Sequence, residues 1–166
     1  MTIAAEKWSH RMSATPVLAP VQGRAVPMEQ VPDPVFAQLM VGPGAAVDPP
    51  RAVVDAVAPV SGTVFKLFPH AFIILTAEGV AVLVHLGIDT VQLNGEGFTT
   101  HVAEGDAVTA GQVVTTYDVP AVEAAGRNPI VPVIALEKQA ADLALGGAVG
   151  AGADLAVTDT LFTVND

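Results

Sequence analysis

The residues best suited to chemistry are two histidines that flank one short apolar segment. His70 follows Phe68 and Pro69, and His85 follows the apolar run at positions 80–84. A neutral imidazole offers a nucleophilic nitrogen at neutral pH, and a second imidazole beside it can donate hydrogen bonds to an incoming group. The pair can do this only if the chain between the two histidines brings their rings together.

The segment between them is typical of a β-hairpin. Two runs rich in β-branched and apolar side chains, at 71–76 and 80–86, are separated by turn residues. With a two-residue loop at 78–79, His85 lies opposite Phe72 and the other histidine is its diagonal neighbour on the same face. A three-residue loop would shift the register by one and send the rings to opposite faces. The sequence predicts the two-residue loop and adjacent rings.

The composition favours an all-β fold. The chain has 166 residues, enough for one domain with a real core, and is 51% hydrophobic. Its 15 glycines and 13 prolines are typical of many short strands joined by tight turns. We expect an antiparallel β-sandwich or barrel-like domain with short peripheral helices at 119–125 and 136–145.

Charge and cysteine content exclude several classes of function. Seven basic against 17 acidic residues give a formal charge of -10, which repels nucleic acid and anionic membranes and attracts a basic protein partner. The absence of cysteine excludes disulfides, thiolate metal sites and a cysteine nucleophile. No apolar run approaches the ~20 residues of a spanning helix, and the first 15 residues have no signal-peptide core. We therefore expect a cytoplasmic protein without direct membrane insertion.

The chain shows one domain preceded by a short extension. Residues 1–15 have no strand periodicity and are expected to be a flexible N-terminal extension. From there, strand-like runs alternate with Gly or Pro turns to the end, which predicts one domain over 16–166. His101 has no comparable neighbours and is expected to be a surface residue.

Several separated motifs together resemble one family. They are VPDPVFA at 31–37, MVG at 40–42, APVSGTV at 58–64, HAF at 70–72, HLGIDTV at 85–91, LNGEGF at 93–98, and EGD to GQ at 104–112. In this order they closely resemble the glucose-class enzyme IIA of the bacterial phosphoenolpyruvate-dependent sugar phosphotransferase system, over about residues 17–164. The resemblance implies an antiparallel β-sandwich and a phosphocarrier without cofactor or metal. It would accept a phosphoryl group from phospho-HPr and pass it to enzyme IIB of a membrane sugar permease.

The resemblance also implies roles for single residues. His85 matches the phosphorylated histidine, and His70 its partner, which contacts the phosphoryl group without accepting it. In-line transfer needs positioning and charge stabilisation, so a sparse site is sufficient. Asp33 and Asp89 match carboxylates that face arginines of HPr. The matching apolar surround, which would exclude water from the phosphohistidine, consists of Phe36, Met40, Val41, Phe68 and Leu83.

Three further expectations concern exposure and orientation. Gly87 has no Cβ to block a close approach by the partner. Phe36 follows Pro34 in a loop and is expected to be exposed. Only Pro69 stands between Phe68 and His70, whereas the family has a longer connection that often carries a threonine bonded to an active-site imidazole. A backbone carbonyl or a water must then orient His85.

Three other interpretations of the same residues stay open, and a fourth, the biotinyl or lipoyl carrier, is excluded. The turns also resemble zinc metallopeptidases that cut cell walls, but no His-x-His pair is present, so a metal would need His70, His85 and a carboxylate. A biotinyl or lipoyl carrier would need a lysine at a hairpin tip, and no lysine lies in such a turn. Asp33 and Asp89 could be simple turn formers. Binding of other proteins according to phosphorylation state would coexist with phosphotransfer.

Overall fold

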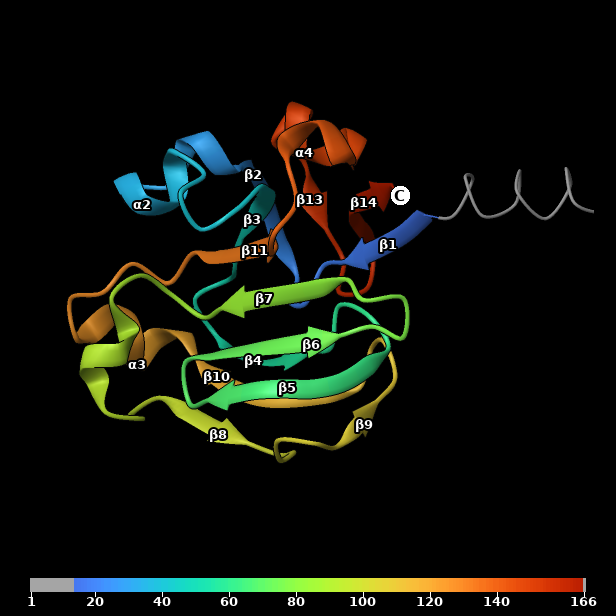
Figure 1. Cartoon of the computed structure of the whole chain (residues 1–166). Helices are drawn as coiled ribbons and strands as arrows, with labels where there is room; N and C mark the ends of the chain where they lie inside the picture. The colour runs from blue at the N-terminus through green and yellow to red at the C-terminus, as the bar shows by residue number, and fades with distance from the viewer. Residues whose placement is uncertain (1–13, 166) are drawn as a thin grey trace, which may run out of the picture.

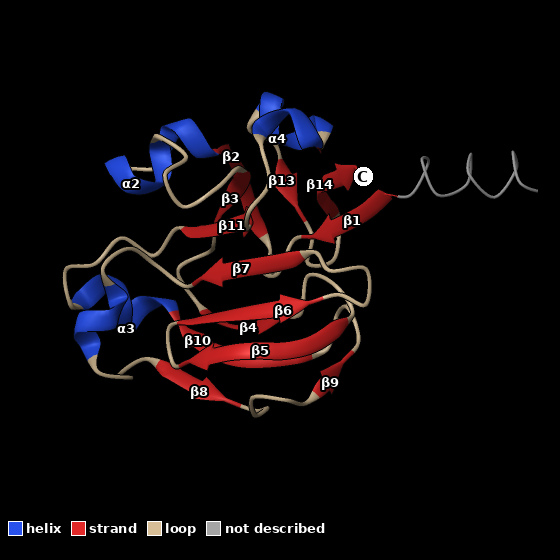
Figure 2. Cartoon of the chain, viewed as in Figure 1, coloured by secondary structure: helices blue, strands red, loops and turns tan. Residues whose placement is uncertain are grey.

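Short antiparallel strands make up most of the computed structural model, which describes residues 14–165. Every strand pairing within that range is antiparallel. The strands form one large sheet and two small ones, with the helices at the periphery (Figures 1 and 2). The sheets do not close into a barrel. The expected all-β sandwich with short helices is confirmed.

The large sheet carries the two histidines. In spatial order its eight strands are β13 (Asp154–Leu155), β2 (Gly23–Pro27), β3 (Gly44–Asp48), β11 (Val131–Ala135), β7 (Ala81–His85), β6 (Ala71–Leu75), β5 (Gly62–Phe68) and β9 (Ala107–Val108).

Two three-stranded sheets complete the β-structure. One has the order β1 (Ala14–Leu18), β14 (Thr160–Asn165) and β12 (Leu143–Leu145), and the other β4 (Val53–Val57), β10 (Val113–Asp118) and β8 (Phe98–Thr100). Figure 1 shows β4 and β10 behind β5 and β6, so the second small sheet forms the opposite layer of the sandwich.

The helices are all short. They are η1 (Met28–Gln30), α2 (Pro34–Ala37), η2 (Thr90–Leu93), α3 (Val119–Ala124), η3 (Ala140–Asp142) and α4 (Gly147–Ala151). The helix expected near 119–125 is confirmed as α3. The one expected over 136–145 is wrong, because a reciprocal capping box between Gln139 and Asp142 closes a single 3₁₀ turn and the chain then enters β12.

The predicted register of the central hairpin is off by one. Val80 donates through its backbone N to the Thr76 hydroxyl, and Thr76 N donates to Val80 O, so the loop has three residues, 77–79. His85 therefore pairs with Ala71, not with Phe72. A three-residue loop needs a residue with positive φ, which Gly79 supplies at +91°. The Thr76 hydroxyl accepts from the Val80 amide, the first after the loop, and strand propensity does not predict this hydrogen bond.

The two faces of the large sheet are covered by different layers, and the second face is covered mainly over β2, β3 and β11. Phe72, Ile74, Val82 and Val84 point into the main core between the sheets and are fully buried. On the other face, a second cluster forms beneath η1 and α2, made of Val26, Met28, Val31, Phe36, Ala46, Ile88, Ile130 and Ile134. Alternation along β7 places Leu83 and His85 on this second face. His85 thus stands at the edge of the second cluster and not inside the main core.

The described part of the chain begins two residues before the expected domain boundary. The expected extension at 1–15 lies almost wholly outside the described residues, but Ala14 and Thr15 already pair with β14. Within residues 14–165, no helix has the length and apolar character needed to cross a bilayer.

Candidate functional site

His85 is the last residue of β7, and a backbone contact fixes its ring. Its Nδ1 lies 2.6 Å from the carbonyl oxygen of Gly87. A carbonyl only accepts hydrogen bonds, so Nδ1 carries the proton and donates it. The lone pair of the neutral ring then resides on Nε2. A backbone carbonyl therefore orients His85, which is one of the two replacements expected for the missing threonine.

His70 lies in the turn between β5 and β6 and not in a strand. Phe68 pairs with Ala71, so Pro69 and His70 are the two loop residues of a tight hairpin. The backbone carbonyl of His70 accepts a hydrogen bond of 2.7 Å from Leu86 N, which connects the turn to the end of β7. Strand alternation does not control a turn residue, and His70 consequently meets His85 despite the shifted register.

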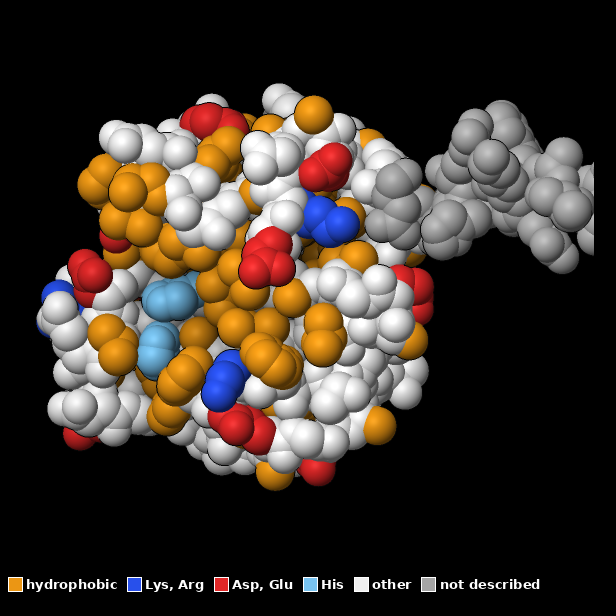
Figure 3. Space-filling view, viewed as in Figure 1, with side chains coloured by type: hydrophobic (Ala, Val, Ile, Leu, Met, Phe, Trp, Pro, Cys, Tyr) orange, Lys and Arg blue, Asp and Glu red, His pale blue; other side chains and the backbone are white. Residues whose placement is uncertain are grey.

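The two imidazoles form a close pair at the surface. Their ring centroids are 5.1 Å apart at an interplanar angle of 72°. Figure 3 shows two adjacent histidine side chains among hydrophobic ones on this face. The prediction that the rings meet is correct, although the register on which it was based is not.

Both histidines are held in the neutral form. Burial lowers the pKa of His85, opposed by the hydrogen bond to Gly87 and by the charges of Asp33 and Asp89. Burial also lowers the pKa of His70, and the neighbouring His85 lowers it further. Nε2 of His85 therefore keeps its lone pair at neutral pH, as a nucleophile must.

Apolar side chains border the pair. The ring of Phe36 lies 5.3 Å from that of His85, and the ring of Phe68 lies 5.9 Å from that of His70. Met40 is 70% and Phe68 48% exposed, while Val41 and Leu83 are half-buried. The expectation that Phe36 is exposed is wrong: it is 9% exposed, because α2 turns it down onto the second cluster. Phe36 packs against the ring of His85 inside the protein, whereas Met40 and Phe68 are exposed and can contact another protein.

Asp33 and Asp89 both lie near His85, as their effect on its pKa requires. Asp33 is also the N-cap of α2, where its carboxylate accepts from the backbone N of Val35 at 2.9 Å. Asp89 is exposed, has a left-handed backbone at φ 58°, and makes no capping bond with its side chain. The turn-forming role thus applies to Asp33, whereas the Asp89 carboxylate serves no such purpose in the fold.

Gly87 has a structural reason that differs from the expected one. It is buried, with φ at +88°, and a Cβ there would lie 2.5 Å from Thr90 Cγ2 and 3.2 Å from Asn128 O. The active-site loop packs this tightly because Gly87 N and Ile88 N donate to the carbonyls of Ile130 and Asn128. Close packing inside the protein is thus sufficient to require a glycine at this position.

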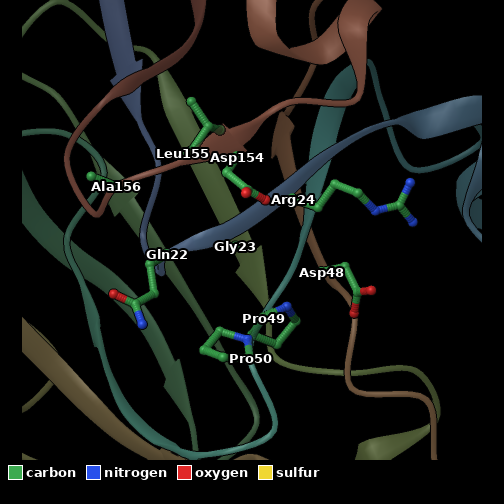
Figure 4. Close-up of a pocket in the computed structure, with 9 residues that line it drawn as sticks. All are labelled: Gln22, Gly23, Arg24, Asp48, Pro49, Pro50, Asp154, Leu155 and Ala156. Carbon is green, nitrogen blue, oxygen red and sulfur yellow. The ribbon is translucent and has the colours of Figure 1, made fainter.

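Other polar groups of the described residues form no comparable site. Between β2, β3 and β13 lies a cavity of about 500 Å³ lined partly by Arg24, Asp48 and Asp154 (Figure 4). Figure 4 shows the Arg24 side chain extending away from Asp154, so the charged groups do not converge. His101 is exposed, as expected, and bonds Thr116 Oγ1 at 2.7 Å. Within residues 14–165, no group of three or more His, Asp or Glu could hold a metal ion.

Comparisons with known proteins agree with this geometry. The sequence profile of the phosphoenolpyruvate-dependent sugar phosphotransferase system family EIIA 1 matches residues 15–141. The chain belongs to this family. It is therefore a phosphotransferase component, a carrier in the phosphoryl relay of sugar uptake, and the metallopeptidase reading has no support.

Two named relatives of this EIIA chain differ in how much of their length it covers. It is 43% identical over 120 residues to the glucose-specific EIIA component of Oceanobacillus iheyensis, covering 71% of this chain and 72% of the relative. It is 48% identical over 137 residues to the glucose-specific EIICBA component of Streptococcus pneumoniae, covering 81% of this chain but only 19% of that protein. The glucose permease IIA of Mycoplasma capricolum superposes with a TM-score of 0.80 at 32% identity, over 91% of this chain and 96% of that one.

One exposed aromatic residue on the sheet that carries the histidines of this EIIA chain has no signal in the sequence. Phe65 is the extra residue of a β-bulge in β5, where the pairing with β6 skips from Val64 to Lys66. The bulge leaves the phenylalanine 54% exposed. A bulge depends on how two strands pair, which strand propensity at Phe65 does not show.

Proposed function

We propose that His85 accepts a phosphoryl group from phospho-HPr on Nε2 and passes it to an enzyme IIB domain. The observation that carries this assignment is the hydrogen bond from Nδ1 of His85 to Gly87 O, which leaves Nε2 as the nucleophile. In the step, a bond forms between Nε2 and phosphorus as the bond to the HPr histidine breaks. The proton on Nδ1 stays in place and balances part of the new negative charge.

His70 is the group that steadies the phosphoryl oxygens. Its ring lies 5.1 Å from that of His85, centroid to centroid, which leaves room for a tetrahedral group bonded to one ring and hydrogen-bonded to the other. Burial and His85 lower its pKa before transfer, and a neutral imidazole donates one hydrogen bond to a phosphoryl oxygen, a bond weaker than that of a charged donor. A reversible carrier needs this moderate stabilisation, since it must release what it accepts.

Docking of the donor would rely on Asp33 and Asp89 together with the exposed apolar side chains. A protein of net charge -10 attracts a basic partner, and two carboxylates beside the nucleophile align it. Met40 and Phe68 are exposed and would become buried when the donor binds. Val41 and Leu83 are half-buried and pack against the second cluster. The phosphocarrier domain, predicted over residues 16–166, would act in the cytoplasm on proteins and not on a free sugar.

Labelled phosphoenolpyruvate with purified enzyme I and HPr tests the assignment. The wild-type chain should become labelled, and His85→Ala should not. His70→Gln should still take up label but release it to enzyme IIB at a rate lower by roughly 10²-fold, because one transition-state donor is lost. Label that persists on His85→Ala would show that another residue is the acceptor.

A further inference from the structure

Three threonines are buried in the described part of the chain, and their hydroxyls have different surroundings. Thr76 is 7% exposed, and Thr90 and Thr115 are fully buried. The Thr76 hydroxyl accepts from Val80 N at the far end of the central hairpin. The Thr115 hydroxyl has no hydrogen-bond partner among the described residues. Of the three, the Thr90 hydroxyl is the one that bonds the loop following His85.

The Thr90 hydroxyl closes the loop that follows the proposed phosphoryl acceptor. It donates to the carbonyl oxygen of Leu86 at 2.7 Å, four residues earlier in the chain. The side chain of Thr90 is fully buried, so it cannot contact a phosphoryl group or a protein that docks at the surface. Any effect of this hydroxyl on the reaction must therefore act through the backbone between Leu86 and Thr90.

The peptide group between Leu86 and Gly87 is held at both of its polar ends. Its carbonyl oxygen accepts from Thr90, and its amide, Gly87 N, donates to Ile130 O at 3.1 Å. Because a peptide group is planar, two hydrogen bonds at opposite ends prevent its rotation. Glycine permits a wide range of backbone conformations, and Gly87 has φ at +88°. The Thr90 hydroxyl thus removes a freedom that the glycine would otherwise allow.

The orientation of this peptide group determines where Gly87 O points. That oxygen belongs to the next peptide group and lies 2.6 Å from Nδ1 of His85. Rotation of the first group would turn the backbone of Gly87 and move its carbonyl away from the imidazole. A neutral ring without this acceptor can carry its proton on Nε2, which then has no lone pair to attack phosphorus. The position of Leu86 O therefore affects the reactive tautomer of His85.

Leu86 also connects the two histidines. Its amide donates to His70 O at 2.7 Å, and its carbonyl accepts from Thr90. One end of Leu86 is therefore bonded to the turn that carries His70, and the other end to the loop that orients His85. A shift of Leu86 would displace the two imidazoles relative to each other as well as change the tautomer of His85.

We infer that Thr90 is a positioning residue for phosphoryl transfer, whose hydroxyl fixes the backbone at Leu86 and Gly87 so that Nε2 of His85 keeps its lone pair. This inference rests on the proposed function, in which His85 is the acceptor. Because Thr90 does not reach the surface, it affects the rate of transfer and not the binding of phospho-HPr.

Substitutions of Thr90 test the inference. Thr90→Val keeps the shape of the side chain and removes the donor to Leu86 O. In ¹H–¹⁵N correlation spectra of this variant, the ring proton of His85 should move from Nδ1 toward Nε2. The kcat for uptake from phospho-HPr should fall about tenfold, with KM changed less than about twofold. Thr90→Ser keeps the hydroxyl and should restore both the ring signals and kcat.

Thr76→Val and Thr115→Val are the matched controls, because they make the same change at other buried positions. The first should lower the free energy of unfolding, since it leaves Val80 N without its side-chain acceptor. The second should not, since Thr115 loses no hydrogen bond that the described residues provide. Neither control should change the ring signals of His85 or kcat. The controls therefore separate the position of a hydroxyl from its effect on stability.

The outcomes distinguish the inference from the proposed function. A wild-type chain that takes up no label overturns the proposed function and, with it, the role of Thr90 in transfer. Normal uptake by the wild type, with unchanged ring signals or an unchanged kcat in Thr90→Val, overturns the inference alone. Thr90→Ala is the second variant without a hydroxyl. Failure of both hydroxyl-free variants to fold would make the hydroxyl a requirement of the fold and would also overturn the inference.

Discussion

Nδ1 of His85 lies 2.6 Å from the carbonyl oxygen of Gly87, two residues further along the chain. This contact determines which nitrogen carries the proton and hence which can attack phosphorus. The phosphoryl group should therefore be found on Nε2. ¹H–¹⁵N correlation spectra of the labelled chain should show a protonated Nδ1 before and after phosphorylation. His85→Asn, whose amide can keep the bond to Gly87 O, should fold normally and take up no label; uptake by this variant would contradict the assignment.

The acidity of the two histidines predicts how stability depends on pH. Burial lowers the pKa of both below the ordinary value of 6.5, so the unfolded chain binds protons on these residues before the folded one does. Their contribution to the free energy of unfolding is complete above pH 6.5 and is lost as the pH falls through the lowered values. Urea unfolding between pH 7.5 and 5 should therefore show a smaller loss for a His70→Gln/His85→Asn double variant than for the wild type. Equal losses would mean that burial does not perturb these rings.

Substitution of Gly87 should damage both stability and transfer. A Cβ there would lie 2.5 Å from Thr90 Cγ2, in a backbone conformation that L residues rarely adopt. We expect Gly87→Ala to lower the free energy of unfolding by about 2–4 kcal/mol and to slow phosphoryl uptake, because the carbonyl that orients His85 must move.

Gly105→Ala is the matched control for Gly87→Ala. Gly105 has φ +92°, close to the +88° of Gly87, but nothing lies within 4 Å of its Cβ position. It should show only the backbone cost, about 1 kcal/mol, with normal uptake. Chemical denaturation of both variants separates the cost of the Cβ clash from the cost of the backbone conformation. An equal loss in the free energy of unfolding for the two variants would contradict the packing argument.

The carboxylates should act on donor binding through charge. Asn is as good an N-cap as Asp, so Asp33→Asn keeps the cap of α2 and removes only the charge. A double variant with Asp89→Asn should raise the KM for phospho-HPr roughly fivefold at low ionic strength, and the difference should shrink at high salt. Asp154→Asn, an exposed carboxylate on β13, is the control. A KM difference that persists unchanged in 1 M salt would indicate a direct contact in place of long-range attraction.

The histidine pair was predictable from sequence because two independent signals coincide there. The apolar runs on either side of Gly79 predict a hairpin, and the residues around His85 resemble a family with a known order of motifs. The register was not predictable, because it depends on whether the Thr76 hydroxyl takes over the Val80 amide. The pairing of His70 with His85 survived this error since His70 lies in a turn.

Exposure at the site was harder to predict than position. A proline before a phenylalanine indicates a loop, but not which side of the loop faces the protein; Phe36 lies in α2 and is buried against the second cluster. For Gly87, the sequence correctly indicated a position where other atoms come too close for a side chain. The atoms that lie near its Cβ position in the structure belong to Thr90 and Asn128. Asn128 is far away in the sequence, and nothing in the residue type of Thr90 indicates the contact.

The short turn at Pro69 and His70 has a consequence for length variation in this family. The backbone carbonyl of His70 accepts a hydrogen bond from Leu86 N, so the residue is held in place on the C-terminal side of the turn. Residues inserted between Phe68 and His70 would lengthen the tip without dislodging that anchor, and such loop growth costs little entropy. The length of this turn can therefore vary beside the proposed phosphoryl acceptor without separating the two imidazoles.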